Sequence, residues 1–309
     1  MQNWQKLGLI IKPGKQKWIK TNIQNPFPEH LKGDIYKIHF AGRDESNYSR
    51  GGYAIIDITK PDKILEWSQK PTLEVGTLGC FDDCGAMPSC IVEHNGQKYM
   101  YYTGWTQQVK TPFSFFIGLA ISKNNEKYKR YSLSPILGRN FYDPYLTASP
   151  YIIKENKLWR MWYVSSIGWE EKNPQNSVAP RHYYFIKHAS SKDGINWETS
   201  KNICIDFIKK NDEYAIARPI VLKENNLYKM WYCYRGGSNT YRAGYAESKD
   251  GLKWTRKDNI VNLDVGKTGW DSEMICYPCV FKHKNNYYML YNGNRYGQTG
   301  CGLAKLSNP

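Results

Sequence analysis

The chain has 309 residues, and its 43 Lys and Arg outnumber its 28 Asp and Glu, which gives a formal charge of +15. No run of about 18 apolar residues could span a membrane, and the N-terminus lacks the apolar core of a secretion signal, so we expect a cytoplasmic protein. The eight cysteines fit that compartment as reduced, mostly buried residues. Lysines are scattered over turns without a basic run, which argues against nucleic acid as a partner.

One pattern recurs along the chain: a proline, an apolar run, a short polar turn and an aromatic-rich run. The repeated prolines are Pro26, Pro88, Pro150, Pro219 and Pro278. Their spacings of 62, 62, 69 and 59 residues suit a four-stranded sheet with its loops better than a helical repeat. The pattern predicts one all-β domain over residues 1–309, a five-bladed β-propeller with four antiparallel strands in each blade.

Each copy predicts the inner hairpin of a blade. The first copy is degenerate, with its second strand at 35–40 and its third at 52–57. In the later copies the turns lie at 94–96, 155–156, 224–226 and 284–286, and aromatic strands follow at 99–102, 159–163, 228–232 and 287–291. The near copies 191–197 and 248–254 each contain Asp-Gly and a tryptophan, which predicts an outer hairpin and packing between blades.

The excess of positive charge requires an explanation by solubility, by an acidic partner, or by both. Guanidinium groups match phosphate and carboxylate geometry, so an anionic small ligand is a reasonable use of that charge. The candidate arginines near the ends of the predicted blades are Arg43, Arg50, Arg181, Arg218, Arg235, Arg242 and Arg295.

Acidic residues recur five to seven positions before four of the repeated prolines. They are Asp82 and Asp83, Asp143, Asp212 and Glu213, and Asp271 and Glu273. Because the first strand of each blade lines the channel of a propeller, these carboxylates could converge on one axial cavity. A carboxylate pair in an aromatic-lined funnel is typical of chemistry at a glycosidic bond. Acids in front of strands also hold loops, and each one taken alone favours that structural role.

Three aromatic residues and a histidine are further candidates for the funnel. Trp105, Trp169 and Tyr277 could stack on sugar faces, although tryptophans also pack between blades. His182 follows an inserted loop at 173–180, and it could contact a phosphate, donate a proton or simply be an exposed loop residue. Cys276 and Cys279 have metal-ligand spacing but flank a proline and need not converge, so we expect no metal and no cofactor.

The chain resembles the five-bladed β-propeller glycoside hydrolases of families 32, 43, 68 and 130, and in particular family 43-like proteins of surface-polysaccharide gene clusters. The repeated pattern carries this resemblance over essentially the whole chain, and the stretches 269–274 and 291–294 are its most distinctive parts. In those hydrolases an acid commonly lies at or next to the position before the blade proline. The residues directly before the prolines here are Asn25, Met87, Ser149, Arg218 and Tyr277, and none is acidic.

This departure moves the expected chemistry to the acids further upstream. We expect Glu213 as proton donor, Asp83 as base or nucleophile, and Glu273 or Asp143 as the group that orients sugar hydroxyls or tunes the donor. The expected substrate-binding residues are Arg43, Asp82, Trp105, Trp169, His182, Arg218, Asp271, Tyr277 and Arg295.

The predicted function is therefore action on a glycosidic bond of an anionic sugar, either phosphorylated or nucleotide-linked. Three alternatives stay open. The resemblance allows a phosphorylase, with Arg43, Arg218 and His182 holding phosphate, or a transglycosylase of surface-glycan biosynthesis. The third is a sugar-binding propeller without catalysis. The sequence leaves the oligomeric state open.

Overall fold

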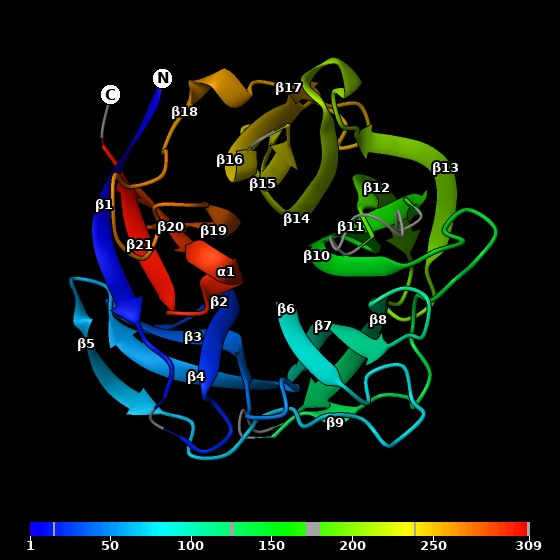
Figure 1. Cartoon of the computed structure of the whole chain (residues 1–309), viewed down its shortest axis with the longest axis horizontal. Helices are drawn as coiled ribbons and strands as arrows, with labels where there is room; N and C mark the ends of the chain where they lie inside the picture. The colour runs from blue at the N-terminus through cyan, green and yellow to red at the C-terminus, as the bar shows by residue number, and fades with distance from the viewer. Residues whose placement is uncertain (15, 124–126, 171–179, 238, 308–309) are drawn as a thin grey trace, which may run out of the picture.

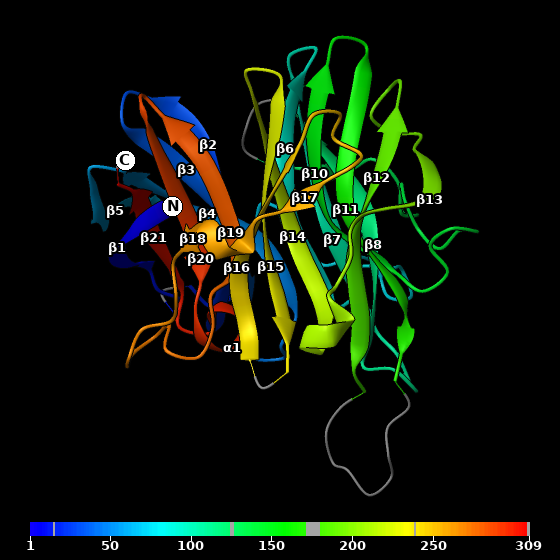
Figure 2. The ribbon, with the colours of Figure 1, turned by 90° about the horizontal axis from the view of Figure 1, so that it is seen from above.

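The protein is described from a computed structural model that covers residues 1–14, 16–123, 127–170, 180–237 and 239–307 (Figure 1). It is all-β, and its strands are arranged as a propeller around a central axis (Figure 1). Figure 2 shows that the strands run roughly along the direction of view of Figure 1. Among the described residues no helix is long and apolar enough to cross a bilayer.

The strands pair into antiparallel units in chain order. The first consists of β2 (Thr21–Lys32), β3 (Ile35–Arg43), β4 (Ser49–Asp57) and β5 (Lys60–Trp67). The second consists of β6 (Gly85–His94), β7 (Gln97–Gln107), β8 (Phe113–Ser122) and β9 (Lys129–Arg130). The third consists of β10 (Thr147–Glu155), β11 (Leu158–Trp169), β12 (His182–Ser191) and β13 (Glu198–Ile205).

The next unit contains β14 (Glu213–Glu224), β15 (Leu227–Gly236), β16 (Asn239–Ser248) and β17 (Thr255–Arg256). The last contains β19 (Cys276–His283), β20 (Asn286–Asn292), β21 (Cys301–Leu306) and the N-terminal strand β1 (Gln2–Ile11), with β18 (Val261–Asn262) beside β1. The short helical segments are η1 (Lys209–Asn211), η2 (Asp258–Ile260) and α1 (Asn294–Gly297).

The inner strands β2, β6, β10, β14 and β19 contact one another in a closed ring around the axis (Figure 1). The predicted hairpins β6–β7, β10–β11, β14–β15 and β19–β20 are all present. Single parallel pairs, Ser49 with Gly85 and Tyr184 with Ala215, link neighbouring units into two larger sheets.

Each repeated proline lies at a break in the register of an inner strand. The pairing shifts between Gln24 and Phe27 in β2, and corresponding shifts occur at the prolines of the other inner strands. The residue before the proline has a positive φ, between 48° and 60°, in four of the five strands. These residues are Asn25, Ser149, Arg218 and Tyr277. A bulge of this kind bends the strand and redirects its side chains. The repeated proline therefore marks where the side chains of each inner strand change direction near the axis of the propeller.

The segments 191–197 and 248–254 form longer turns than the two-residue hairpins that their Asp-Gly pairs predict. The Asp193 carboxylate accepts hydrogen bonds from the backbone N–H groups of Ile195 and Asn196, both at 2.8 Å, in an Asx-type turn. The turn also contacts the preceding unit, because the Tyr101 hydroxyl donates to the Gly194 carbonyl at 2.8 Å. These turns therefore hold neighbouring units together.

The N-terminal strand completes the sheet that contains the last strands of the chain. β1 pairs with β21 from Trp4 opposite Leu306 to Ile11 opposite Cys301. Ile11 is fully buried in the core, whereas Leu7 on the same strand is 39% exposed. The repeat pattern of the sequence carries no signal for this closure.

We expect Ile11→Ala to lower the free energy of unfolding by about 2–5 kcal/mol. The substitution leaves a cavity in the core where the N-terminal strand β1 pairs with β21 near the other end of the chain. Leu7→Ala is the matched control on the exposed side of β1 and should cost less than about 1 kcal/mol. Urea unfolding of both variants measures the difference. Equal losses would contradict a role for β1 in closing the fold.

Candidate functional site

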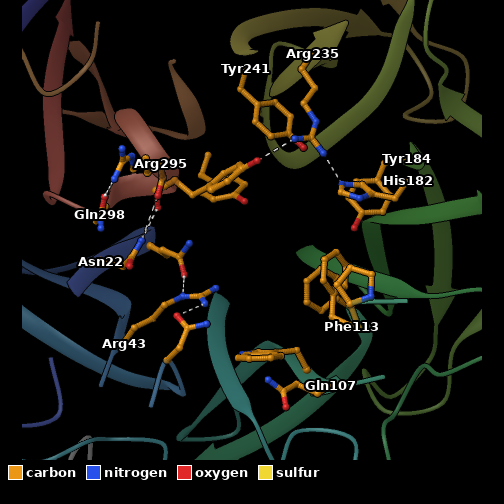
Figure 3. A pocket seen from close by; sticks show the side chains of 17 residues that line it. Asn22, Arg43, Gln107, Phe113, His182, Tyr184, Arg235, Tyr241, Arg295 and Gln298 are labelled. Atoms are coloured by element: carbon orange, nitrogen blue, oxygen red, sulfur yellow. Dashed lines mark hydrogen bonds between the residues drawn. The ribbon is translucent and has the colours of Figure 1, made fainter. Parts of the chain in front are cut away.

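One end of the propeller holds an open cavity of about 510 Å³ (Figure 3). It is lined by three arginines, one histidine, a set of amide side chains and many aromatic rings. The lining residues are Asn22, Gln24, Arg43, Asn47, Trp105, Gln107, Pro112, Phe113, Phe115, His182, Tyr184, Arg235, Tyr241, Tyr277, Arg295, Tyr296 and Gln298. No aspartate or glutamate is found among these lining residues in the described part of the chain.

Arg43, at the end of β3, is held in the cavity wall by two amide side chains. Its Nε donates to Gln24 Oε1 at 3.0 Å, and its Nη1 donates to Asn47 Oδ1 at 2.7 Å. The guanidinium lies 5.6 Å from the ring centroid of Trp105, within cation–π range. Burial lowers the pKa of Arg43, although an arginine remains charged at neutral pH.

Arg235, in β15, approaches the cavity from another side (Figure 3). Its Nη1 donates to the Tyr296 hydroxyl at 2.9 Å, and its guanidinium lies 4.9 Å and 4.8 Å from the ring centroids of Tyr214 and Tyr241. Its Nη2 contacts His182 Nε2. The buried Nε of Arg235 has no hydrogen-bond partner among the described residues.

The contact with Arg235 determines the protonation state of His182. An arginine only donates, so His182 Nε2 accepts and the ring hydrogen lies on Nδ1. Burial and the charge of Arg235 lower the pKa of His182 to about 3, which makes the imidazole neutral at pH 7. His182 begins β12 and lines the cavity wall, and it is not an exposed loop histidine. Residues 173–179 of the predicted inserted loop lie outside the described residues.

Arg295 is presented by a strained segment of backbone. Arg295 and Tyr296 have φ values of 52° and 60°, in the left-handed region that non-glycine residues rarely adopt. The Asn22 side chain donates to the carbonyl oxygens of both residues at 3.4 Å. Gln298 Oε1 accepts from Arg295 Nη1, also at 3.4 Å. Strain of this kind often accompanies a functional site.

Arg43, Arg235 and Arg295 share one property. Within the described chain, none of the three has a carboxylate within ion-pair distance, whereas Arg50, Arg130 and Arg256 each have at least one. Figure 3 shows the three uncompensated guanidinium groups on different sides of the cavity. The cavity is therefore strongly positive and offers several free N–H donors to an anion.

Most of the predicted acidic residues have a different place in the fold. Asp82, before β6, accepts from the Tyr102 hydroxyl at 2.9 Å and from Arg130 Nε at 2.7 Å. Asp143, before β10, accepts from the Tyr163 hydroxyl at 3.0 Å and from Lys187 Nζ at 2.8 Å. Both carboxylates are fully buried, so they anchor the loop in front of the inner strand to the strands beyond it.

The same arrangement recurs in the last unit and is varied in the fourth. Asp271 accepts from the Tyr291 hydroxyl at 3.1 Å and from Lys6 Nζ at 2.7 Å. Glu213, at the start of β14, accepts from Arg256 Nη1 at 2.8 Å and from the backbone N–H of Ile208 at 2.9 Å. The repeated position of these acids thus reflects a repeated structural anchor.

Asp83 and Glu273 also lie outside the cavity. Asp83 accepts from the backbone N–H of Gly79 at 2.9 Å, within the turn that precedes β6. Glu273 is exposed, and in the part of the chain that the structure describes its hydrogen bonds to Asn294, Thr240 and Arg242 are made by its backbone. The expectation that these acids converge with Asp143 and Glu213 on one axial cavity is therefore wrong, because four of the seven upstream acids, including Asp143 and Glu213, are paired within their own units.

The predicted substrate-binding residues divide into three groups. Five of them line the cavity: Arg43, Trp105, His182, Tyr277 and Arg295. Trp169 lies in a neighbouring groove that also contains Arg181 and Glu213, and Arg218 is buried below the cavity. Asp82 and Asp271 belong to the structural anchors.

The sequence indicated Arg235 only as one of seven candidate anion-binding arginines, and it did not indicate Tyr184 or Tyr241 as binding residues. Arg235 directly follows the aromatic run of β15, and this position at the end of a second strand was the available signal. The tyrosines resembled ordinary sheet-packing residues, and only the arrangement in space distinguishes them.

No family model matches the chain. Among solved structures, it is similar to a complex of BT0996 with RGII, with a TM-score of 0.76, 18% identity and coverage of 99% of this chain and 92% of that one. It is also similar to a thermostable family-43 glycoside hydrolase, with a TM-score of 0.67, 15% identity and coverage of 97% and 96%. The chain has the fold of the propeller glycoside hydrolases.

Two proteins of Mycobacterium tuberculosis are related to the chain in sequence. They are the uncharacterized protein MT1551 of strain CDC 1551 / Oshkosh and the uncharacterized protein Rv1502 of strain ATCC 25618 / H37Rv. Each is 39% identical over 306 residues, which cover 99% of this chain and 99% of the relative. The chain belongs to the family of these two proteins.

We expect Asp143→Asn to lower the free energy of unfolding by about 3–5 kcal/mol, because it leaves the Lys187 ammonium buried without its counter-charge. Glu273→Gln is the control at an exposed acid and should change stability by less than about 0.5 kcal/mol. Chemical denaturation of both variants measures this. An Asp143→Asn protein as stable as the wild type would contradict the anchor role.

We also expect His182 to make stability depend on pH. The folded state keeps His182 neutral down to about pH 3, whereas the unfolded chain binds a proton near pH 6.5. The stability that buried, neutral His182 contributes to the folded state is fully present above pH 6.5 and is lost as the pH falls. The Tm should therefore drop more between pH 7 and pH 5 in the wild type than in His182→Gln, which retains an acceptor for Arg235. Parallel curves would contradict this.

Proposed function

We propose that the protein binds an anionic carbohydrate in the arginine-lined cavity. The observation that carries this proposal is the set of three arginines, Arg43, Arg235 and Arg295, that line one cavity and have no carboxylate partner in the described chain. Each can form a charge-assisted hydrogen bond to a phosphate or carboxylate group. The fold supports the carbohydrate part of the proposal, because the similar solved structures include a glycoside hydrolase and a complex with RGII.

The remaining wall suits the neutral part of such a ligand. The rings of Trp105 and Phe113 offer flat apolar faces for a sugar, and the amides of Gln24 and Gln107 can bond to hydroxyl groups. A cavity of about 510 Å³ lies within the usual range for small-molecule sites. The proposed ligand class is a phosphorylated or nucleotide-linked sugar.

The cavity supports binding of a ligand better than it supports hydrolysis catalysed by two carboxylates. Most glycosidases place two carboxyl groups about 5–9.5 Å apart across the scissile bond. The cavity wall, as far as the structure describes it, contains no carboxyl group, and its one histidine is neutral at pH 7. We therefore assign Asp83, Asp143, Glu213 and Glu273 no catalytic step in this proposal.

We further propose that the antiparallel units are the five four-stranded blades of a single domain over residues 1–309. Each unit has one repeated proline in its inner strand, and β1 supplies the outer strand of the last unit. We also propose a cytoplasmic role in the metabolism of surface glycans, and the cytoplasmic part is supported by the eight cysteines, which are all free in the described chain.

Ligand screening tests the proposed function. We expect sugar phosphates or nucleotide sugars to raise the Tm, since a ligand that binds only the native state stabilises it, whereas neutral oligosaccharides should have little effect. Arg43→Ala and Arg295→Ala should each weaken binding about 10- to 100-fold in calorimetry, because each removes a charged hydrogen bond.

Arg139→Ala is the matched control, because this exposed arginine bonds to the Tyr145 carbonyl and does not line the cavity. Two results would contradict the proposal. The first is binding of neutral glycans that Arg43→Ala leaves unchanged. The second is turnover of a bound glycan that Asp83→Asn or Glu213→Gln abolishes without loss of binding.

A further inference from the structure

Arg218 is a second feature of the axis, separate from the ligand cavity. It lies in β14 at the bulge before Pro219, with a φ of 60° and no exposed side-chain surface. It lines neither the main cavity nor the smaller space of about 80 Å³ that shares six lining residues with it. Its Nη2 donates long hydrogen bonds to the carbonyl oxygens of Asn25 at 3.3 Å and Pro26 at 3.4 Å.

The guanidinium lies where the inner strands of the propeller converge. Its bonds reach β2, and the titratable groups that interact with it are the thiols of Cys90, Cys233 and Cys279 and the phenol of Tyr151. These residues belong to β6, β15, β19 and β10. Together with the hydrogen bonds to β2, every unit therefore contributes a group that interacts with this one charge. Arg218 is thus a charged residue at the centre of the fold.

Nothing in the described structure compensates this charge. Arg218 has no carboxylate within ion-pair distance, and its buried Nε and Nη1 have no hydrogen-bond partner among the described residues. Burial raises the pKa of Cys90, Cys233 and Cys279 to about 12, so these thiols are neutral at pH 7. An arginine does not lose its proton in proteins, and a buried charge is costly unless it is paired.

We propose that Arg218 binds a small monovalent inorganic anion, of the chloride type, at the axis of the propeller. The free Nε and Nη1 donate to this ion, and its single negative charge neutralises the single positive charge of the guanidinium. The surrounding thiols and phenol form a soft environment that suits a weakly hydrated halide. The ion is a structural part of the fold, and the proposal does not depend on the ligand of the main cavity.

Halide titration of the full chain tests this proposal. The protein is dialysed into sodium gluconate, and the Tm is measured as bromide replaces gluconate at constant ionic strength. Above the Kd, the Tm of the wild type should rise by about 2 °C for each tenfold increase in bromide. Arg218→Met should remove this dependence. Arg139→Met, at an exposed arginine with no described carboxylate partner, should retain it.

A crystal of the wild type grown in bromide gives a second measurement that does not depend on a folded variant. We expect an anomalous difference peak within hydrogen-bond distance of Arg218 Nε and Nη1. A wild-type Tm that does not respond to bromide, together with the absence of such a peak, would overturn the proposal. Because neither readout uses a sugar, failure here is distinguishable from failure of the proposed function.

Discussion

The fold depends on a buried carboxylate that ties the loop before an inner strand to the strands outside it. Asp143 shows this most completely, because a tyrosine hydroxyl, a serine hydroxyl and the Lys187 ammonium all bond to it at 2.7–3.0 Å. Removing one member would leave a buried polar group unpaired, so the arrangement specifies where each loop enters the sheet. Asp82 and Asp271 repeat it with other cations.

This use of the acids determines the charge of the central cavity. Carboxylates are paired with lysines and arginines inside the units, so the arginines that reach the funnel have no described carboxylate partner. In a fold similar to that of glycoside hydrolases, the described cavity wall thus contains three arginines and no carboxyl group, whereas most glycosidases act through a pair of carboxyl groups. The same imbalance recurs at Arg218, which interacts with thiols, the phenol of Tyr151 and two carbonyl groups but has no carboxylate partner among the described residues.

The repeated proline connects these features. It breaks the register of each inner strand, and in four strands the residue before it adopts a positive φ. Those residues and Met87 occupy the positions before the prolines, where the resemblance to propeller glycoside hydrolases led us to expect acids. Here Asn25, Met87, Ser149 and Tyr277 line the small space that shares residues with the cavity, and Arg218 is fully buried in β14. The bulge brings the side chains before the five prolines close to one another near the axis. The types of these residues then determine what they can bind.

The repeat, its period, the hairpins and the all-β class could all be predicted from the sequence, because they follow from local patterns of proline, turn residues and aromatic strands. The sequence also indicated six residues of the cavity wall, among them Arg43, Arg235 and Arg295. Which charged groups lie side by side became clear only from the arrangement of the strands in space. The distance from Asp143 to Lys187, or from Arg235 to His182, depends on how separate strands pack, and no local spacing encodes it. The closure by β1 was hidden for the same reason, since it joins residues almost 300 positions apart.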